Sequence, residues 1–143
     1  MLASDIREGA CRCGAVRFKA SGKPIWTAHC HCKECRAATG SPFTTYAGYA
    51  EKAVSYSPGA PLTAFESSPG VERRFCARCG TPIDFKGARW PGEIHLFISN
   101  FAEPGAFAPF AHAYCKDQLP WVKLNDGLPR YRTLKSEGGP LPP

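Results

Sequence analysis

The sequence predicts an all-β fold in one small domain, and three observations support this prediction. Pro-Gly occurs four times, at residues 58–59, 69–70, 91–92 and 104–105, and this pair is typical of tight turns. The segments between these turns are short and rich in β-branched and aromatic residues. The chain has 143 residues, of which 43% are hydrophobic, so it can form one core but has no room for a second domain.

Seven or eight short strands are expected, because alternating or β-rich patterns recur along the chain. They cover residues 16–18, 43–49, 62–65, 71–75, 83–85, 94–98 and 107–114. At most one short helical turn is expected, over residues 32–38, and Gly40 can end it. We assign residues 1–135 to a single domain and expect residues 136–143, which are rich in Gly and Pro, to form a disordered tail.

Seven of the eight cysteines fall in three tight clusters that have the spacing of ligands for a soft divalent metal. Thiolates two or three residues apart can bind one tetrahedral ion, and zinc does so without redox chemistry. Four sulfurs close a structural site, whereas three leave one coordination position for water or substrate. We therefore expect two zinc ions, one structural and one catalytic. The clusters are Cys11 and Cys13, then Cys30, Cys32 and Cys35, then Cys76 and Cys79.

Two of the clusters suit one four-cysteine site. Residues i and i+2 of a strand face the same side, so Cys11 and Cys13 can present both sulfurs to one ion. Cys76 and Cys79, followed by Gly80, resemble a zinc knuckle, in which the glycine lets the turn bend. An ion shared by both pairs would tie the start of the chain to its middle, about sixty residues away, and stabilise a small domain.

The remaining cluster has three ligands. We expect Cys30 and Cys32 to share one face of an extended segment, and Cys35 to approach from the helical turn that follows. These three residues are the candidates for the catalytic zinc. His29 and His31 alternate with the cysteines, so they are expected to face away from the ion in supporting or core positions.

Five other residues receive less specific expectations. Cys115 stands alone, and it is read as a small core residue, with a fourth ligand of the three-cysteine site as the alternative. His95 and His112 lie in strand-like segments and are expected to be hydrogen-bonded core residues. Arg36 and Lys33 are candidates to receive a substrate carboxylate, although a solvated surface charge is the simpler role for both.

Disulfides are the alternative to metal, since eight cysteines are an even number at high density. The first ten residues lack the basic stretch, apolar core and cleavage site of a signal peptide. We therefore expect reduced thiols and a cytoplasmic protein. No apolar run reaches the roughly twenty residues that a membrane helix needs, so no membrane partner is expected.

The formal charge of +6 overstates how basic the protein is. Seven metal-bound thiolates and two divalent ions would bring it to about +3. The basic residues are also scattered, and Arg73-Arg74 is the longest basic run. We expect a solvated surface and no nucleic-acid partner.

Four segments together resemble the glutathione-dependent formaldehyde-activating enzyme family, which also includes centromere protein V. They are Gly9-Ala-Cys-Arg-Cys-Gly-Ala-Val-Arg-Phe18, His29-Cys-His-Cys-Lys-Glu-Cys-Arg36 with Thr39-Gly40-Ser41, Arg74-Phe-Cys-Ala-Arg-Cys-Gly-Thr81, and Pro120-Trp121 with Asp126-Gly-Leu-Pro-Arg-Tyr131. The resemblance implies an Mss4-like β-tent of antiparallel sheets. It also implies a structural zinc on Cys11, Cys13, Cys76 and Cys79, and a catalytic zinc on Cys30, Cys32 and Cys35.

The reaction that the resemblance implies is addition of a thiol, glutathione or a similar one, to formaldehyde or a related small aldehyde. Its product is an S-hydroxymethyl adduct, and carbon-sulfur lyase describes the reverse direction. The sequence identifies no proton donor for this reaction. Two alternatives stay open: a zinc-stabilised binding module for a protein or nucleic acid, and a thiol sensor that releases zinc when Cys30, Cys32 or Cys35 is oxidised.

Overall fold

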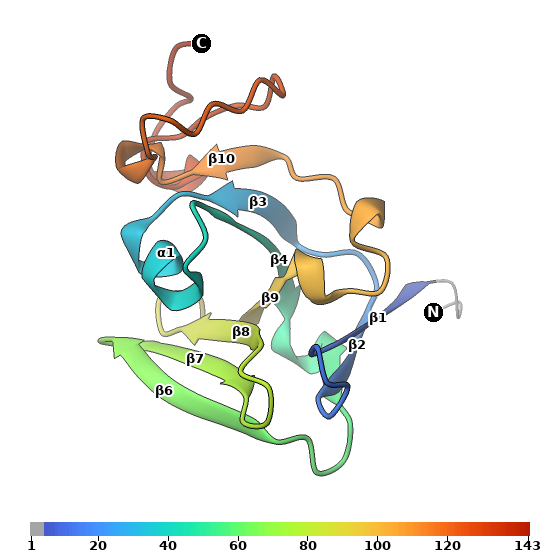
Figure 1. Cartoon of the computed structure of the whole chain (residues 1–143). Helices are drawn as coiled ribbons and strands as arrows, with labels where there is room; N and C mark the ends of the chain where they lie inside the picture. The colour runs from blue at the N-terminus through green and yellow to red at the C-terminus, as the bar shows by residue number, and fades with distance from the viewer. Residues whose placement is uncertain (1–4) are drawn as a thin grey trace.

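Ten β-strands in two sheets and one α-helix make up the fold, as described by a computed structural model for residues 5–143 (Figure 1). The smaller sheet has the order β1-β2-β5, with β1 at Ile6–Ala10, β2 at Arg17–Ser21 and β5 at Val54–Tyr56. The larger sheet has the order β10-β3-β4-β9-β8-β7-β6. Neighbouring strands are antiparallel in both sheets, except that β10 runs parallel to β3.

The larger sheet has seven strands, and the one helix lies between β3 and β4 in the sequence. Helix α1 spans Lys33–Thr39, and Gly40 ends it in the left-handed conformation with φ of 70°. The strands are β3 Trp26–Cys30, β4 Thr44–Ala50, β6 Leu62–Ser68, β7 Val71–Cys76, β8 Pro82–Gly87, β9 Glu93–Phe97 and β10 Ala111–Ala113.

The predicted all-β class with one short helix is confirmed, but the strands are more numerous than predicted. β1 and β5 have weak β patterns of their own, and both gain their hydrogen bonds by pairing with β2. The strand predicted over residues 107–114 is only three residues long, because Pro109 cannot donate a ladder hydrogen bond. Three of the four Pro-Gly pairs form turns with glycine at positive φ, whereas Pro104–Ala106 forms a 3-10 turn.

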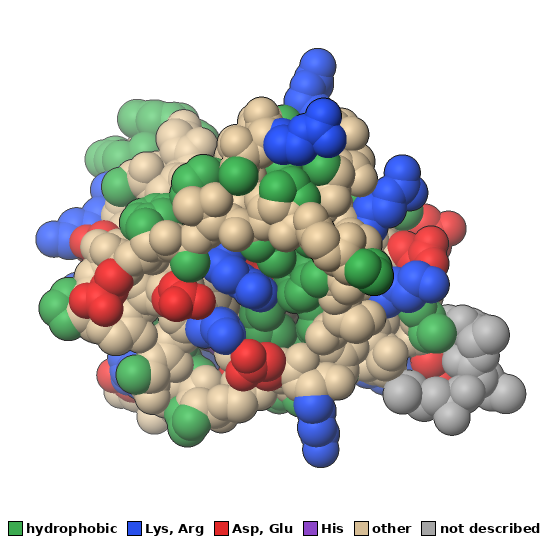
Figure 2. Space-filling view, turned by 90° about the horizontal axis from the view of Figure 1, so that it is seen from below, with side chains coloured by type: hydrophobic (Ala, Val, Ile, Leu, Met, Phe, Trp, Pro, Cys, Tyr) green, Lys and Arg blue, Asp and Glu red, His purple; other side chains and the backbone are tan. Residues whose placement is uncertain are grey.

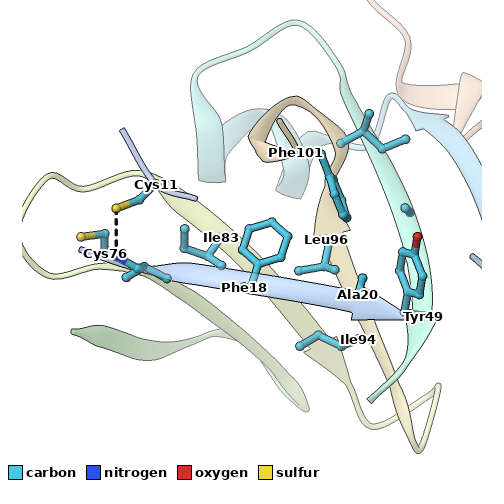
Figure 3. Packing of buried hydrophobic residues seen from close by; sticks show 12 residues of the cluster. Cys11, Phe18, Ala20, Tyr49, Cys76, Ile83, Ile94, Leu96 and Phe101 are labelled. Atoms are coloured by element: carbon cyan, nitrogen blue, oxygen red, sulfur yellow. Dashed lines mark hydrogen bonds between the residues drawn. The ribbon is translucent and has the colours of Figure 1, made fainter. Parts of the chain in front are cut away.

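The main core lies between the two sheets (Figure 3). Phe18 of β2 contacts Phe101 edge to face, with ring centroids 5.1 Å apart. β4 and β9 contribute alternate residues, since successive strand side chains point to opposite faces. The buried members are Cys11, Val16, Phe18, Ala20, Ala47, Tyr49, Cys76, Ile83, Ile94, Leu96, Ile98 and Phe101.

The other face of the larger sheet carries a second, smaller cluster. Tyr46 of β4 and Phe85 of β8 meet edge to face with centroids 5.0 Å apart, and Cys35 of α1 packs against them. Trp26, Trp90 and Phe97 are partly buried around this group. The alternation of β4 therefore sends Tyr46 to one face and Tyr49 to the other, so the two clusters share one sheet.

A buried carboxylate links the two sheets at the strand ends. Asp84 of β8 accepts two hydrogen bonds from Arg74, at 2.9 Å from Nε and 2.8 Å from Nη2, and a further one from the Tyr56 hydroxyl of β5. Its side chain is fully buried, whereas that of Arg74 is 21% exposed. The Arg74 guanidinium also lies 4.8 Å from the Tyr56 ring centroid. The ion pair lies within the larger sheet, and the hydrogen bond from Tyr56 connects it to the smaller sheet.

The positive side chains on the face shown in Figure 2 stand in small groups, with acidic side chains between them. The predicted scatter of charge is thus visible on that face. The basic run Arg73-Arg74 was expected on a solvated surface, and this expectation is wrong: Arg73 is 6% exposed and Arg74 holds Asp84. No helix within residues 5–143 is both long and apolar enough to cross a membrane.

The last residues pack against the rest of the chain. A 3-10 turn at Lys135–Glu137 places Glu137 2.8 Å from Arg89, and the Leu141 N–H donates to the Arg130 carbonyl. The boundary at residue 135 and the disorder of the tail in solution stay predictions.

Replacing Asp84 with Asn should lower the free energy of unfolding by about 2–3 kcal/mol, because Arg74 would keep a half-buried charge without its counter-ion. Tyr56→Phe removes one hydrogen bond only and should cost about 1 kcal/mol. Urea denaturation of both variants measures this difference. Equal, small effects would mean that the network does not hold the sheets together.

Candidate metal centres

The first centre lies at one end of the main core, where two loops meet. Cys11 and Cys13 sit in the turn between β1 and β2, Cys76 is the last residue of β7, and Cys79 sits in the turn that follows it. Their four sulfurs lie within 4.8 Å of one another. In Figure 3, the Cys11 and Cys76 sulfurs lie beside each other at the end of the packed layer. The structure thus brings together the four cysteines that were predicted to form one site.

The geometry of the first pair differs from the prediction. Cys11 and Cys13 were expected on one strand face, but both follow the end of β1 in a turn. The turn is stabilised by a hydrogen bond from the Gly14 N–H to the Cys11 carbonyl at 3.1 Å, with φ of 79° at Gly14. Such positive φ is strained for residues other than glycine. The Val16 N–H donates to the Cys11 sulfur at 3.3 Å, which is the dashed line in Figure 3.

The second pair forms a similar loop. The Gly80 N–H donates to the Cys76 carbonyl at 2.8 Å, and Gly80 has φ of 78°, as the knuckle prediction requires. Thr81 connects the two loops, because its hydroxyl lies 3.1 Å from the Cys79 sulfur and accepts from the Arg12 N–H at 3.1 Å. The Thr81 hydroxyl is the main cause that lowers the pKa of Cys79 to about 5. Cys79 is therefore prepared to act as a thiolate ligand.

The sulfur spacing fits zinc. Four sulfurs placed tetrahedrally at 2.3 Å from an ion are about 3.8 Å apart. Cys11 and Cys13 are 3.6 Å apart, and Cys13 and Cys76 are 3.9 Å apart. All eight cysteines are free, so the structure has none of the disulfides that were the alternative.

Replacing Cys76 with Ser should abolish cooperative folding. A structural zinc contributes on the order of 10 kcal/mol or more, which exceeds the net stability of most small domains. Thermal melting with measurement of bound zinc tests this, and Cys115→Ser is the matched control because Cys115 is also buried but lies outside both sulfur groups. A Cys76→Ser protein that melts cooperatively with unchanged zinc content would contradict the four-cysteine assignment.

The second centre lies on the opposite face of the larger sheet, at the junction of β3 and α1. Cys30 is the last residue of β3, Cys32 is the N-cap of α1, and Cys35 lies in its first turn. The Cys35 N–H donates to the Cys32 sulfur at 3.2 Å. The three sulfurs lie within 4.8 Å of one another, as predicted for this cluster. Cys35 is buried, whereas Cys30 and Cys32 are partly exposed.

The sulfurs of this centre are closer together than those of the first. Cys32 and Cys35 are 2.9 Å apart, and Cys35 and Cys30 are 3.5 Å apart. To bind one tetrahedral zinc ion, the sulfurs of Cys32 and Cys35 would have to move about 1 Å farther apart. Hydrogen bonding with Cys30 and Cys32 lowers the pKa of Cys35, whereas contacts with Cys32 and Cys35 raise the pKa of Cys30. One thiolate is therefore shared among three sulfurs, a donor set that suits a soft divalent ion.

Two polar side chains of the sheet approach Cys35, and sequence reasoning missed both. Arg73 Nη2 lies 4.0 Å from the Cys35 sulfur, and the Tyr46 hydroxyl and Arg73 both help to lower the pKa of Cys35. The signal for Arg73 was its place between Val71 and Phe75, two apolar residues on the same strand face. Tyr46 had no comparable signal, because a tyrosine in a β-rich run is most simply a core residue.

His95 lies near this centre in an aromatic setting. It is 2% exposed and contacts the rings of Phe85, Trp26 and Trp90, with centroids 4.4, 4.7 and 5.1 Å away. It was expected to be a hydrogen-bonded core residue. It is buried, but neither ring nitrogen has a partner, and the Glu93 carboxylate is 3.7 Å from Nε2. Burial lowers the pKa of His95 to about 4, so its ring is neutral at pH 7.

His95 should make the protein less stable in mild acid. The folded pKa of about 4 lies below the ordinary value of 6.5, so the unfolded chain binds the proton first as the pH falls through 6.5. Between pH 7.5 and 5.5, the free energy of unfolding should fall by about 1 kcal/mol more in the wild type than in His95→Phe. Urea titrations at both pH values measure this, and equal falls in the two proteins would refute it.

The other three histidines, His29, His31 and His112, contact one another near strands β3 and β10. His29 bonds the Thr45 hydroxyl at 2.8 Å and stacks on His112 at 4.8 Å. His31 Nε2 lies 2.9 Å from His112 Nδ1, and His112 Nε2 lies 2.8 Å from the Asp126 carboxylate. His29 and His31 are therefore engaged away from the sulfurs, and His112 is a hydrogen-bonded core residue, as expected.

Two further candidates have structural contacts. The Cys115 thiol donates to the His112 carbonyl at 3.7 Å and belongs to neither sulfur group. Arg36 was a candidate for a substrate carboxylate. Its Nη1 donates to the His31 carbonyl at 2.9 Å and to the Asp117 carbonyl. This nitrogen therefore connects α1 to the 3-10 turn at Cys115–Asp117.

The fold and the two sulfur groups define a small β protein with one closed and one three-cysteine site, both consistent with zinc. The chain belongs to the glutathione-dependent formaldehyde-activating enzyme family, because the family profile matches residues 6–117. The family expected from the sequence motifs is thus confirmed. Membership supports a glutathione-dependent, formaldehyde-activating enzyme function.

Individual relatives agree with this assignment. A Halomonas elongata protein named "Putative glutathione-dependent formaldehyde-activating enzyme" is 37% identical over 130 residues, covering 83% of this chain and 81% of that protein. A Schizosaccharomyces pombe protein described as an uncharacterized lyase is 35% identical over 78 residues, covering 54% of this chain and 56% of that one. The crystal structure of a Rhodobacter sphaeroides protein has a TM-score of 0.56 at 19% identity, covers 87% of this chain and 99% of that one, and supports the fold.

Proposed function

We propose that the protein adds the sulfur of glutathione, or of a similar thiol, to formaldehyde or a related small aldehyde. The product is an S-hydroxymethyl thiol, and the reverse reaction is that of a carbon-sulfur lyase. The observation that carries this proposal is the group of three cysteines, Cys30, Cys32 and Cys35, within 4.8 Å of one another in a member of this family. Three ligands leave a fourth position for the substrate sulfur.

The two centres would have different tasks. Cys11, Cys13, Cys76 and Cys79 would hold a structural zinc at the end of the core. Cys30, Cys32 and Cys35 would hold a catalytic zinc, which when bound supplies a Lewis acid that keeps the substrate thiol ionised. The partial exposure of Cys30 and Cys32 supports approach of the substrate from their side, because Cys35 and its neighbours are buried.

Charged groups near the second centre suit glutathione, which carries two carboxylates and an ammonium group. Tyr114 directly follows Ala113, which pairs with Cys30 between β10 and β3, and burial raises the pKa of its phenol. Tyr114 has φ of 56°, and it is the single non-glycine residue in 5–143 with positive φ. Such strain is common at functional sites. Arg89 and Glu137 form an exposed ion pair at 2.8 Å beside Tyr114. We assign Arg89 to a carboxylate of glutathione and Glu137 to its ammonium group.

The proposed compartment is the cytoplasm, because partly exposed thiols such as those of Cys30 and Cys32 stay reduced there.

Native mass spectrometry with excess glutathione tests the proposal directly, because one spectrum counts zinc ions and bound thiol. The wild type should carry two zinc ions and one glutathione. Cys32→Ser should keep the structural ion and a cooperative melt but lose glutathione and most of the second zinc, since a hydroxyl is a poorer ligand than a thiolate.

Cys115→Ser is the control, and it should retain both ions and the adduct. One zinc and no glutathione in the wild type would reject the enzyme proposal and favour the binding module. Unfolding of Cys32→Ser would mean that the structural and catalytic centres are exchanged.

A further inference from the structure

Two hydrogen-bond donors beside Cys35 are buried without a partner. They are Arg73 Nη1 and the Tyr46 hydroxyl. Arg73 is 6% exposed and Tyr46 is 1% exposed, so bulk water does not reach them freely. An unpaired buried donor costs on the order of 1–3 kcal/mol, and more when it is charged. Two such donors near one cysteine therefore indicate a ligand that accepts a hydrogen bond from each of them.

The donors are held in place by other contacts. Arg73 Nε donates to the Ser67 hydroxyl at 3.0 Å, and the guanidinium lies 4.8 Å from the centroid of the Phe85 ring. The Tyr46 ring packs edge to face on the same Phe85 ring, at 5.0 Å. Phe85 thus positions both groups, and each is left with its terminal donor free. Rigid donors of this kind need no reorganisation when charge develops in front of them.

The Cys35 thiolate does not account for both donors. Its contact with Arg73 is made by Nη2 and is long, at 4.0 Å. Tyr46 lies close to Cys35 and Arg73, but its hydroxyl makes no hydrogen bond of good geometry with either. One guanidinium nitrogen and one hydroxyl, on two side chains that pack on the same Phe85 ring, are therefore without a partner near Cys35. Their common ligand should be a small atom that is rich in electrons, and an anionic oxygen fits both donors.

We propose that Arg73 and Tyr46 bind the oxygen of the aldehyde and stabilise the negative charge that it gains when the thiol adds. This inference rests on the proposed function, and it identifies the electrostatic partner that the sequence did not reveal. Both residues would touch the reacting oxygen and so act as catalytic residues.

The chemical step is balanced without another reactant. The thiol loses its proton to solvent when it ionises. A sulfur electron pair forms the carbon-sulfur bond, the π pair of the carbonyl moves to oxygen, and the alkoxide is held by Arg73 and Tyr46. A solvent proton then completes the hydroxyl, so the sum is thiol plus aldehyde giving the S-hydroxymethyl adduct.

Tyr46→Phe and Arg73→Met test the inference in the zinc-loaded protein. Each should lower kcat for adduct formation about 100-fold, which is typical when one donor to an oxyanion is removed. The Kd of glutathione should stay within about twofold, because the thiol is bound elsewhere. Formate is the second probe, since it is a small anion with oxygens of the required kind. Its affinity for the protein-glutathione complex, measured by calorimetry, should fall about tenfold or more in both variants.

Tyr49→Phe is the matched control. Tyr49 is on the same strand, is 1% exposed and also has an unpaired hydroxyl, but it lies in the main core on the opposite face. This variant should keep the wild-type kcat and formate affinity. Since Tyr46→Phe removes a single oxygen atom, it keeps the test valid even if Arg73→Met fails to fold.

The outcomes separate the two proposals. A wild type that binds no glutathione rejects the proposed function itself. A wild type that binds glutathione and reacts, with Tyr46→Phe and Tyr49→Phe alike in kcat and formate affinity, overturns the role of the donors and leaves the function standing. A loss of glutathione affinity with unchanged kcat also overturns it, because the donors would then hold the thiol and not the oxygen.

Discussion

The contact between two cysteine turns is the constraint on which the arrangement of the sheets depends. Cys13 and Cys76 are 63 positions apart, yet their sulfurs are 3.9 Å from each other. One turn belongs to the small sheet and the other to the large sheet, so an ion there would fasten the sheets at one end of the core. A cross-link that closes a loop of this length removes conformational freedom from the unfolded chain and so stabilises the fold.

In the proposed function, the two faces of the large sheet have separate roles, one structural and one chemical. One face packs against the small sheet through Phe18, Tyr49 and their neighbours, and it carries the four-cysteine group at its end. The other face carries Tyr46, Phe85 and Cys35 beneath α1. Because alternate residues of one strand serve opposite faces, the backbone of β4 is fixed by packing on one side while its other side presents Tyr46 to the sulfurs. A well-packed core thus supplies the rigidity that fixed dipoles need in catalysis.

Residues of one chemical type at short spacing could be predicted from the sequence to form a site. Contacts between residues that are distant in the sequence could not. Cysteine spacing predicted both sulfur groups, because two or three residues suffice to direct thiolates at one ion. It could not show that Cys11 and Cys13 lie in a turn, since a turn and a strand can both converge two sulfurs. Arg73 was misread as part of a solvated basic run, because its burial depends on β8 placing Phe85 beside it. Strands β1, β3 and β5 were absent from the predicted segments, since pairing with neighbouring strands decides their conformation.

Arg73 also changes the electrostatics of the second centre. A divalent ion with three thiolates has a net charge near −1, which opposes the approach of a fourth thiolate and of a developing alkoxide. With such an ion bound at the second centre, the Arg73 guanidinium, buried 4.0 Å from the Cys35 sulfur, would bring the local charge close to zero. The electrostatic attraction between Arg73 and a negatively charged site is much stronger in a low-dielectric interior than it would be in water. In the proposed reaction, the site would then accept one negative charge on the substrate sulfur, and the Nη1 nitrogen would remain for the charge that forms on oxygen.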